Sequence, residues 1–195
     1  MVISTKELLI KYKDYKNPKM KIKTEVDKKV YYPLKKGLYE TNRNTEGIFL
    51  TTYLMSPSYV SFEYVLSTTG LIPERVYAYT CATTLKRHTT KYSNIFGDYI
   101  YEDVPVYAFR FGINLIETTG YSYFIATKEK ALCDLLYKKR IVNSIKELKE
   151  LLFEDLRVDE EMFWDLDFEV LKSLIPKYKK KNLELLGRLI KKGKK

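Results

Sequence analysis

The sequence predicts an α+β fold in which a small basic helical unit precedes a sheet and a series of helices. Helical spacing of apolar residues dominates the first part of residues 1–41, and the polar stretch "NRNTEG" follows this unit. Short runs of alternating Tyr, Val, Ile and Phe then occupy residues 75–127, and helical spacing returns afterwards. We therefore expect two domains, residues 1–41 and residues 48–195, the second of them helical from about residue 127.

The N-terminal unit is predicted to begin with two short helices. Ser4 and Glu7 have the spacing of a capping box, in which each side chain accepts a hydrogen bond from a free backbone N–H at the helix start. Pro18 follows a turn and suits the first position of a second helix. Apolar residues at every fourth position from Ile22 to Val30 would form its buried face. The alternative is an edge strand, since "KMKIK" also fits a period of two.

Two β-prone runs joined by Lys35, Lys36 and Gly37 predict a hairpin after this helix. The order of helix, turn, basic helix and basic hairpin is that of a minimal winged helix-turn-helix without its usual first helix. Such a unit places its second helix in the major groove of DNA, while hairpin lysines contact phosphates. Either Lys23 or Thr24 is expected to reach a base edge. The predicted DNA-binding residues are Lys19, Lys21, Lys23, Thr24, Lys28, Lys29, Lys35 and Lys36.

Positive charge is concentrated at the two ends of the chain. Residues 1–41 contain 11 Lys and 5 acidic residues, and residues 176–195 contain 9 Lys or Arg and 1 acidic residue. Since the whole chain has a net charge of +10, the middle is mildly acidic. A compositional bias toward lysine would spread the charge evenly, whereas basic ends favour a polyanionic partner. The lysines of residues 177–195 would either add non-specific contacts to the DNA backbone or form a solvated tail.

The segment "PSYVSFEYVLSTTGLIPE" predicts a buried helix between two turns. Ser58 or Ser61 is expected to cap this helix, and Gly70 is expected to end it. The side chains expected on its buried side are Val60, Tyr64 and Val65.

Four alternating runs follow this segment, namely "VYAYTCATT", "GDYIYEDV", "VYAFRF" and "YSYFIAT". Their composition predicts an antiparallel sheet. Beyond them, helices are expected in "TKEKALCDLLYKKR" and over residues 144–153, 159–174 and 178–192.

The sequence contains few of the residues that catalysis or metal binding would need. Cys81, Cys133 and the single histidine, His88, are not at metal-ligand spacing. Cys81 is interpreted as a strand cysteine and His88 as a surface-loop residue beside Arg87, rather than as a nucleophile and its base. Walker, dinucleotide-binding and nucleophile-elbow motifs do not occur in the sequence.

Asp165 and Asp167 resemble the paired aspartates that bind Mg²⁺ in nucleotidyltransferases. Such a pair should lie on a strand after a glycine-containing loop for the triphosphate, whereas the pattern here is helical and no such loop precedes it. We interpret the pair as part of an acidic, solvated face. The sequence therefore predicts a protein that is not an enzyme and has no metal and no cofactor.

The sequence also lacks features of membrane insertion and export. No run of about 18 apolar residues occurs, and the N-terminus lacks the pattern of a signal peptide. Two cysteines are too few for a disulfide framework. We expect a soluble cytoplasmic protein without a membrane partner.

Three blocks of sequence resemble the AbiEi family, the antitoxins of the AbiE abortive-infection toxin–antitoxin systems. "PSYVSFEYVLSTTGLIPE" is similar to the family pattern Pro-Ser-Tyr-(Ile/Val)-Ser-x-x-Ser-Ala-Leu-x-x-x-Gly-Leu-Ile-Pro-Glu, with Tyr64-Val65 in place of Ser-Ala. "IATKEKALCDLLY" resembles a second family block, and "KKGLYE" resembles the end of the family's wing.

The resemblance implies a type IV antitoxin with an N-terminal winged helix that represses its own operon and a C-terminal domain that neutralises a toxin. That toxin would be an AbiEii-like nucleotidyltransferase, and direct contact between the two proteins is left open. We expect double-stranded operator DNA with inverted repeats, bound by two copies of a protein that is monomeric in solution. The alternative is a protein-interaction module whose sheet domain binds a toxin or another protein directly, without specific DNA binding.

Overall fold

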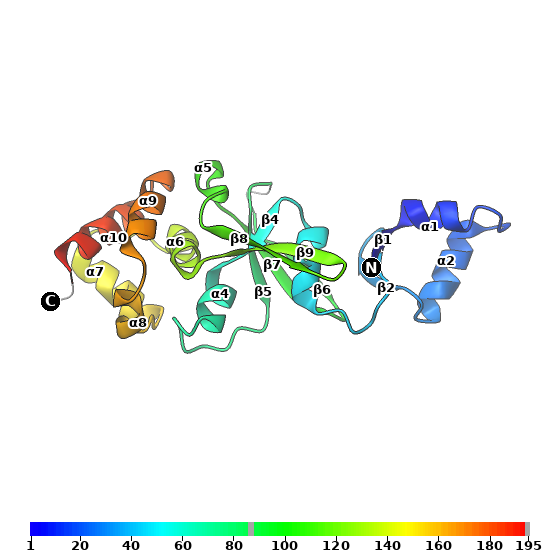
Figure 1. Ribbon diagram of the computed structural model, residues 1–195, viewed down its shortest axis with the longest axis horizontal. Coiled ribbons are helices and arrows are strands. Elements are labelled where there is room, and N and C mark those ends of the chain that lie inside the picture. Colours follow the sequence, from blue (N-terminus) through cyan, green and yellow to red (C-terminus); the bar gives the residue numbers. More distant parts are fainter. Residues whose placement is uncertain (86–87, 194–195) are drawn as a thin grey trace.

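The structure is a computed structural model that describes residues 1–85 and 88–193. It confirms the predicted α+β class. The molecule is elongated, with the N-terminal unit at one end, the larger sheet in the middle and the last helices at the other end (Figure 1). Arg87 of the predicted loop and the last two lysines of the predicted tail lie outside the described residues.

The first 40 residues form two helices and a three-stranded antiparallel sheet of order β1-β3-β2. The elements are β1 (Val2–Ser4), α1 (Thr5–Lys11), α2 (Pro18–Asp27), β2 (Tyr32–Lys35) and β3 (Leu38–Glu40). Ser4 and Glu7 form the predicted capping box, and Pro18 lies in the first turn of α2 after the capping residue Asn17. The two predicted helices and the hairpin are confirmed, and "KMKIK" is helical rather than an edge strand. Strand β1 was not predicted, because three residues are too few for a periodic pattern.

Helix α2 is shorter than predicted. It ends at Asp27, and Lys29 has a φ of 58°, in the left-handed region. Val30 is consequently 44% exposed, whereas Ile22 is buried. The buried core of this unit consists of Leu8, Tyr12, Ile22 and Tyr31.

The larger sheet has the strand order β6-β7-β5-β4-β9-β8 and is mixed, which corrects the prediction of an antiparallel sheet. Strand β4 is parallel to β9, and β5 is parallel to β7. Alternation of apolar residues predicts a strand but not the direction of its neighbours. The parallel pairs could therefore not be predicted from the pattern. The strands are β4 (Ser58–Val60), β5 (Tyr79–Thr83), β6 (Thr90–Asn94), β7 (Gly97–Asp103), β8 (Ile113–Thr118) and β9 (Tyr121–Ala126).

Two segments around this sheet differ from the prediction. The expected helix after Pro57 starts later, because its first residues form the central strand β4 and helix α4 covers Phe62–Thr68. Gly70 ends that helix with a φ of 77°, as expected. The run "VYAFRF" is not a strand but contains the short helix α5 (Val106–Phe109). It follows Pro105, which cannot donate a hydrogen bond to a strand ladder.

Some of the remaining helices cover the sheet, and the later ones continue beyond α6 to the end of the described chain (Figure 1). These helices are η1 (Gly47–Leu50), α3 (Thr51–Leu54), α6 (Lys128–Lys138), α7 (Ile145–Lys149), η2 (Glu150–Asp155), α8 (Glu160–Trp164), α9 (Phe168–Leu174), η3 (Ile175–Lys177) and α10 (Lys181–Lys192). One large hydrophobic core includes side chains of the sheet, α4, α6 and the later helices. Over residues 1–85 and 88–193, no helix combines the length and the apolar character needed to cross a membrane.

Candidate nucleic-acid interface

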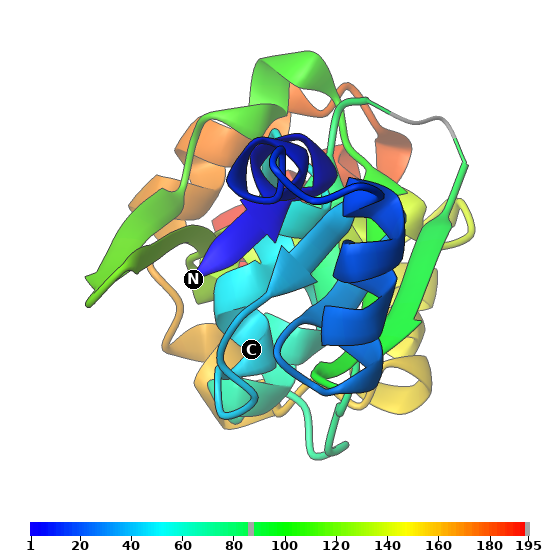
Figure 2. The ribbon, with the colours of Figure 1, turned by 90° about the vertical axis from the view of Figure 1, so that its right-hand side faces the viewer.

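Helix α2 lies at the outer end of the N-terminal unit and presents one face to solvent. Its inner face packs on the small core through Ile22 and Val26. Viewed from this end of the molecule, α2 lies at the front (Figure 2). Met20 is 58% exposed, and Lys23 is also exposed. The Thr24 hydroxyl donates a hydrogen bond to the Met20 carbonyl at 3.0 Å, and its oxygen lone pairs can still accept a hydrogen bond.

A groove between α2 and the hairpin turn brings together lysines from both elements. Its volume is about 360 Å³. Lys19 and Lys23 line it from the helix, and Lys35 and Lys36 line it from the hairpin, where Gly37 has a φ of 83°. The apolar lining residues are Ile22, Val26, Pro33 and Tyr39. Four of the predicted DNA-binding lysines therefore share one surface.

Lys21 lies on the side of α2 that faces α1. Its Nζ is 2.6 Å from Glu25 Oε1 and 5.1 Å from the centre of the Tyr15 ring. Hydrogen bonding between the two side chains raises the pKa of Lys21 and lowers that of Glu25. Lys21 is therefore partly neutralised within the helix and does not line the groove.

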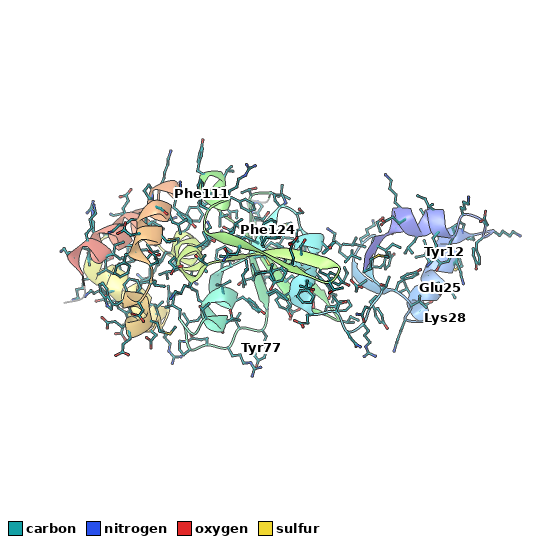
Figure 3. The ribbon with its side chains drawn as sticks, in the orientation of Figure 1. Tyr12, Glu25, Lys28, Tyr77, Phe111 and Phe124 are labelled. Atoms are coloured by element: carbon teal, nitrogen blue, oxygen red, sulfur yellow. The ribbon has the colours of Figure 1, made fainter. Side chains whose placement is uncertain are left out.

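Lys28 and Lys29 follow the last residue of α2 and are exposed. Figure 3 shows Lys28 near Glu25 at the outer end of the N-terminal unit. These two lysines extend the basic surface beyond the helix, although they do not lie on its face as a longer helix would have placed them.

Lys35 is the predicted residue whose placement differs most from expectation. Its half-buried ammonium donates a hydrogen bond to the carbonyl of Leu54 at 2.5 Å, and burial lowers its pKa. Nearby, Asn94 Nδ2 donates to the Leu34 carbonyl at 3.2 Å. Lys35 thus joins the N-terminal unit to the rest of the protein instead of lying free on the hairpin.

A buried polar cluster was not predicted from the sequence. Asp134 Oδ1 accepts hydrogen bonds from Lys130 Nζ at 2.9 Å and from the Tyr178 hydroxyl at 2.6 Å. Its Oδ2 accepts from the Tyr59 hydroxyl at 2.9 Å and from Ser61 Oγ at 2.7 Å. All five side chains are buried. Burial and the adjacent Asp134 charge raise the pKa values of Tyr59 and Tyr178, so both phenols stay protonated and donate.

The cluster joins two of the sequence blocks described above. Tyr59 and Ser61 belong to the first block, and Lys130 and Asp134 belong to "IATKEKALCDLLY". Of the two serines expected to cap α4, Ser58 lies in β4 and Ser61 lies at the N-cap position. The Ser61 hydroxyl donates to Asp134 and makes no capping hydrogen bond. The sequence signal for the cluster is a Lys and an Asp four residues apart in a helix, with the apolar run Ala131 to Cys133 between them. The full burial of the cluster indicates a structural role.

The residues considered above for catalysis are Cys81 and His88, and Asp165 and Asp167. Cys81 is buried in β5, and His88 is exposed in the loop before β6. Asp167 caps α9 by accepting hydrogen bonds from two backbone N–H groups, whereas Asp165 follows the end of α8. In the described part of the chain, no three His, Cys, Asp or Glu side chains gather in a way that would hold a metal ion.

No protein-family model and no curated protein matches the chain significantly. The resemblance to AbiEi antitoxins therefore rests on the three sequence blocks. Of these, the wing-like block supplies the turn beside α2, and the other two supply four of the five side chains of the buried cluster.

Proposed function

We propose that this protein is an antitoxin of the AbiEi type that binds DNA through its N-terminal unit and represses its own operon. The groove that Lys19, Lys23 and Lys36 share carries this proposal, because it combines an exposed helix face with a basic turn. The element order β1-α1-α2-β2-β3 is compatible with a minimal winged helix. In such a unit the helix contacts base edges while the hairpin contacts the DNA backbone.

In the proposed complex, α2 enters the major groove with its outer face toward the bases. Lys23 and Thr24 have the hydrogen-bonding groups for base edges, and the exposed Met20 can contact a thymine methyl group. Lys19 and Lys36 lie at the sides of this face, where phosphates of the two strands would pass. Lys28 and Lys29 would add backbone contacts beyond the helix end.

The second part of the proposal concerns the toxin. The protein would counteract an AbiEii-like nucleotidyltransferase encoded with it, with or without a stable complex between them. On DNA, two copies of the monomer would occupy the two halves of an inverted repeat, because a two-fold arrangement of protein matches a two-fold operator.

The test is fluorescence anisotropy with duplex DNA from upstream of the gene and a scrambled duplex, measured over a salt series. The triple variant K19Q/K23Q/K36Q should bind the specific duplex more weakly. Its salt slope should fall by about two, since Lys19 and Lys36 are assigned to phosphates and each phosphate contact contributes roughly 0.9 to the slope. Lys146 is an exposed lysine far along the chain, and K146Q is the control that should bind like the wild type.

Equal binding of the two duplexes, or an unchanged affinity of the triple variant, would reject the repressor proposal. The antitoxin proposal is tested separately by co-expression with the neighbouring toxin gene. Rescue of growth by a chain lacking residues 1–41 would favour the protein-interaction alternative for that part of the activity.

A further inference from the structure

A second surface combines exposed aromatic rings with lysines. Tyr107 in α5 is 73% exposed, and Phe111 just after this helix is 47% exposed. The Nζ of Lys177 lies 3.7 Å from the centre of the Phe111 ring, and that of Lys179 lies 5.5 Å from the centre of the Tyr107 ring. Each ring is therefore paired with a cation from a distant part of the sequence. Figure 3 shows Phe111 beside α5, far from Lys28 at the other end of the molecule.

The turn that carries the two lysines is held from beneath by the buried cluster. Tyr178, which lies between them in sequence, has its hydroxyl hydrogen-bonded to Lys130 and Asp134. Because this side chain points inward, the lysines on either side are directed toward the surface. Lys179 has a φ of 48°, a conformation that an L residue adopts only where its surroundings impose it.

Lys130 of the buried cluster also fixes the aromatic side of the surface. Gly112, next to Phe111, has a φ of 67°, and a Cβ at this position would lie 2.9 Å from Cβ of Lys130. Its carbonyl accepts a hydrogen bond from the Thr127 N–H at 2.8 Å. The rings and the lysines are therefore positioned relative to each other before any ligand binds, which lowers the entropic cost of binding.

The segment that begins with the two lysines is strongly positive. Residues 177–193 contain seven Lys or Arg and one acidic residue, and Arg110 lies between the two aromatic residues in sequence. Exposed rings beside a basic segment complement a polyanion that has free aromatic faces of its own. Duplex DNA does not meet this requirement, because its bases are already stacked inside the helix.

We propose that the surface formed by Tyr107, Phe111, Lys177 and Lys179 binds single-stranded nucleic acid. Bases stack on the two rings, and the lysines beside the rings pair with the adjoining phosphates. This site is separate from the duplex-binding groove of α2 and does not depend on it.

The test uses fluorescein-labelled 20-mers of uridylate and thymidylate and a duplex of the same length, with binding measured by anisotropy. The variant Y107A/F111A should bind the single strands at least about tenfold more weakly, because each base–aromatic stack accounts for roughly fivefold or more in affinity. Its duplex affinity should not change. Y107L/F111L keeps apolar bulk without rings and should show the same loss, which separates stacking from folding defects.

Two controls make the test specific. Tyr77 is 75% exposed and has the Arg75 guanidinium 5.1 Å from its ring centre, so Y77A removes an equivalent cation–aromatic pair at another place and should have less than a twofold effect. K19Q/K23Q/K36Q should keep single-strand affinity even if it loses duplex binding. Unchanged single-strand binding by Y107A/F111A, or an equal loss in Y77A, would overturn the proposal. Tighter binding of uridylate than thymidylate would assign the site to RNA.

Discussion

Replacement of Lys130 by Met tests how much the buried cluster stabilises the junction of sheet and C-terminal helices. Lys130 Nζ and Asp134 Oδ1 are 2.9 Å apart, and neither side chain is exposed to solvent. Met keeps most of the apolar stem but removes the charge, so the Asp134 carboxylate loses its cation. Loss of one partner of a buried ion pair costs about 3–5 kcal/mol. We expect the lower end for Lys130→Met, because Tyr59, Ser61 and Tyr178 still donate hydrogen bonds to the carboxylate.

The reverse replacement, Asp134→Leu, should cost more. It leaves a buried ammonium without its carboxylate and removes the acceptor of three hydroxyl groups, each of which costs about 1–3 kcal/mol when buried without a partner. Urea unfolding followed by Trp164 fluorescence gives the free energy of unfolding by linear extrapolation. Lys139→Met is the control, because the Nζ of Lys139 pairs with Glu63 at 3.2 Å where both side chains are about one-third exposed. That variant should lose less than about 1 kcal/mol.

A free energy of unfolding for Lys130→Met within about 1 kcal/mol of the wild type would refute this reasoning. It would mean that the carboxylate is satisfied by hydroxyl groups alone and that the lysine contributes little. A double variant Lys130→Met/Asp134→Leu that is more stable than the wild type would contradict the expected cost of the hydroxyl groups, since three donors would then be unpaired without loss of stability.

Three further outcomes are expected at single positions. Gly112→Ala should lower the free energy of unfolding by about 1–3 kcal/mol because its Cβ would press on Lys130, whereas Gly120→Ala, at a φ of 86° with open space around it, should cost less in the same urea assay. Burial raises the pKa of Glu40, but hydrogen bonds from the N-terminal ammonium and a backbone N–H outweigh it and hold the pKa below its ordinary value. The stabilisation from Glu40 is therefore present at neutral pH and lost as pH falls through that lowered pKa. The difference in free energy of unfolding between wild type and Glu40→Gln should shrink in acid, and a constant difference would contradict this. Burial raises the thiol pKa of Cys81 and Cys133, so a thiol reagent should modify them only when urea unfolds the protein, and immediate reaction would show that they are accessible.

Local signals made the N-terminal unit predictable from sequence. Helix starts are specified within about four residues by the capping pair Ser4 and Glu7 and by Pro18. Gly37 specifies the turn of the hairpin in the same local way. The larger sheet depends on pairings between distant segments. Strand β4 is three residues long and pairs with β5 and β9, so neither its length nor its neighbours gave a local pattern.

The differences among the predicted DNA-binding lysines could not be read from residue type. Lys19 and Lys23 line the groove because of their positions around α2, whereas Lys21 lies toward α1 and pairs with an acid. Lys35 and Lys36 are adjacent in sequence and both line the groove, yet the Lys35 ammonium donates to the Leu54 carbonyl, whereas Lys36 is exposed. Helix phase accounts for the first difference. The second arises from packing of the hairpin on the larger domain, which a local pattern does not encode.

The buried cluster changes what the most distinctive sequence blocks indicate. Tyr59, Ser61, Lys130 and Asp134 lie in the two longest blocks and are buried. The first three side chains donate hydrogen bonds to the Asp134 carboxylate. A buried carboxylate tolerates few substitutions around it, because each lost donor leaves an unpaired charge or hydroxyl. A pattern of this kind can therefore persist for packing alone and need not mark a binding site. Surfaces that bind DNA or a partner are better sought where charge is exposed, at the α2 groove and at the turn that Tyr178 holds in place.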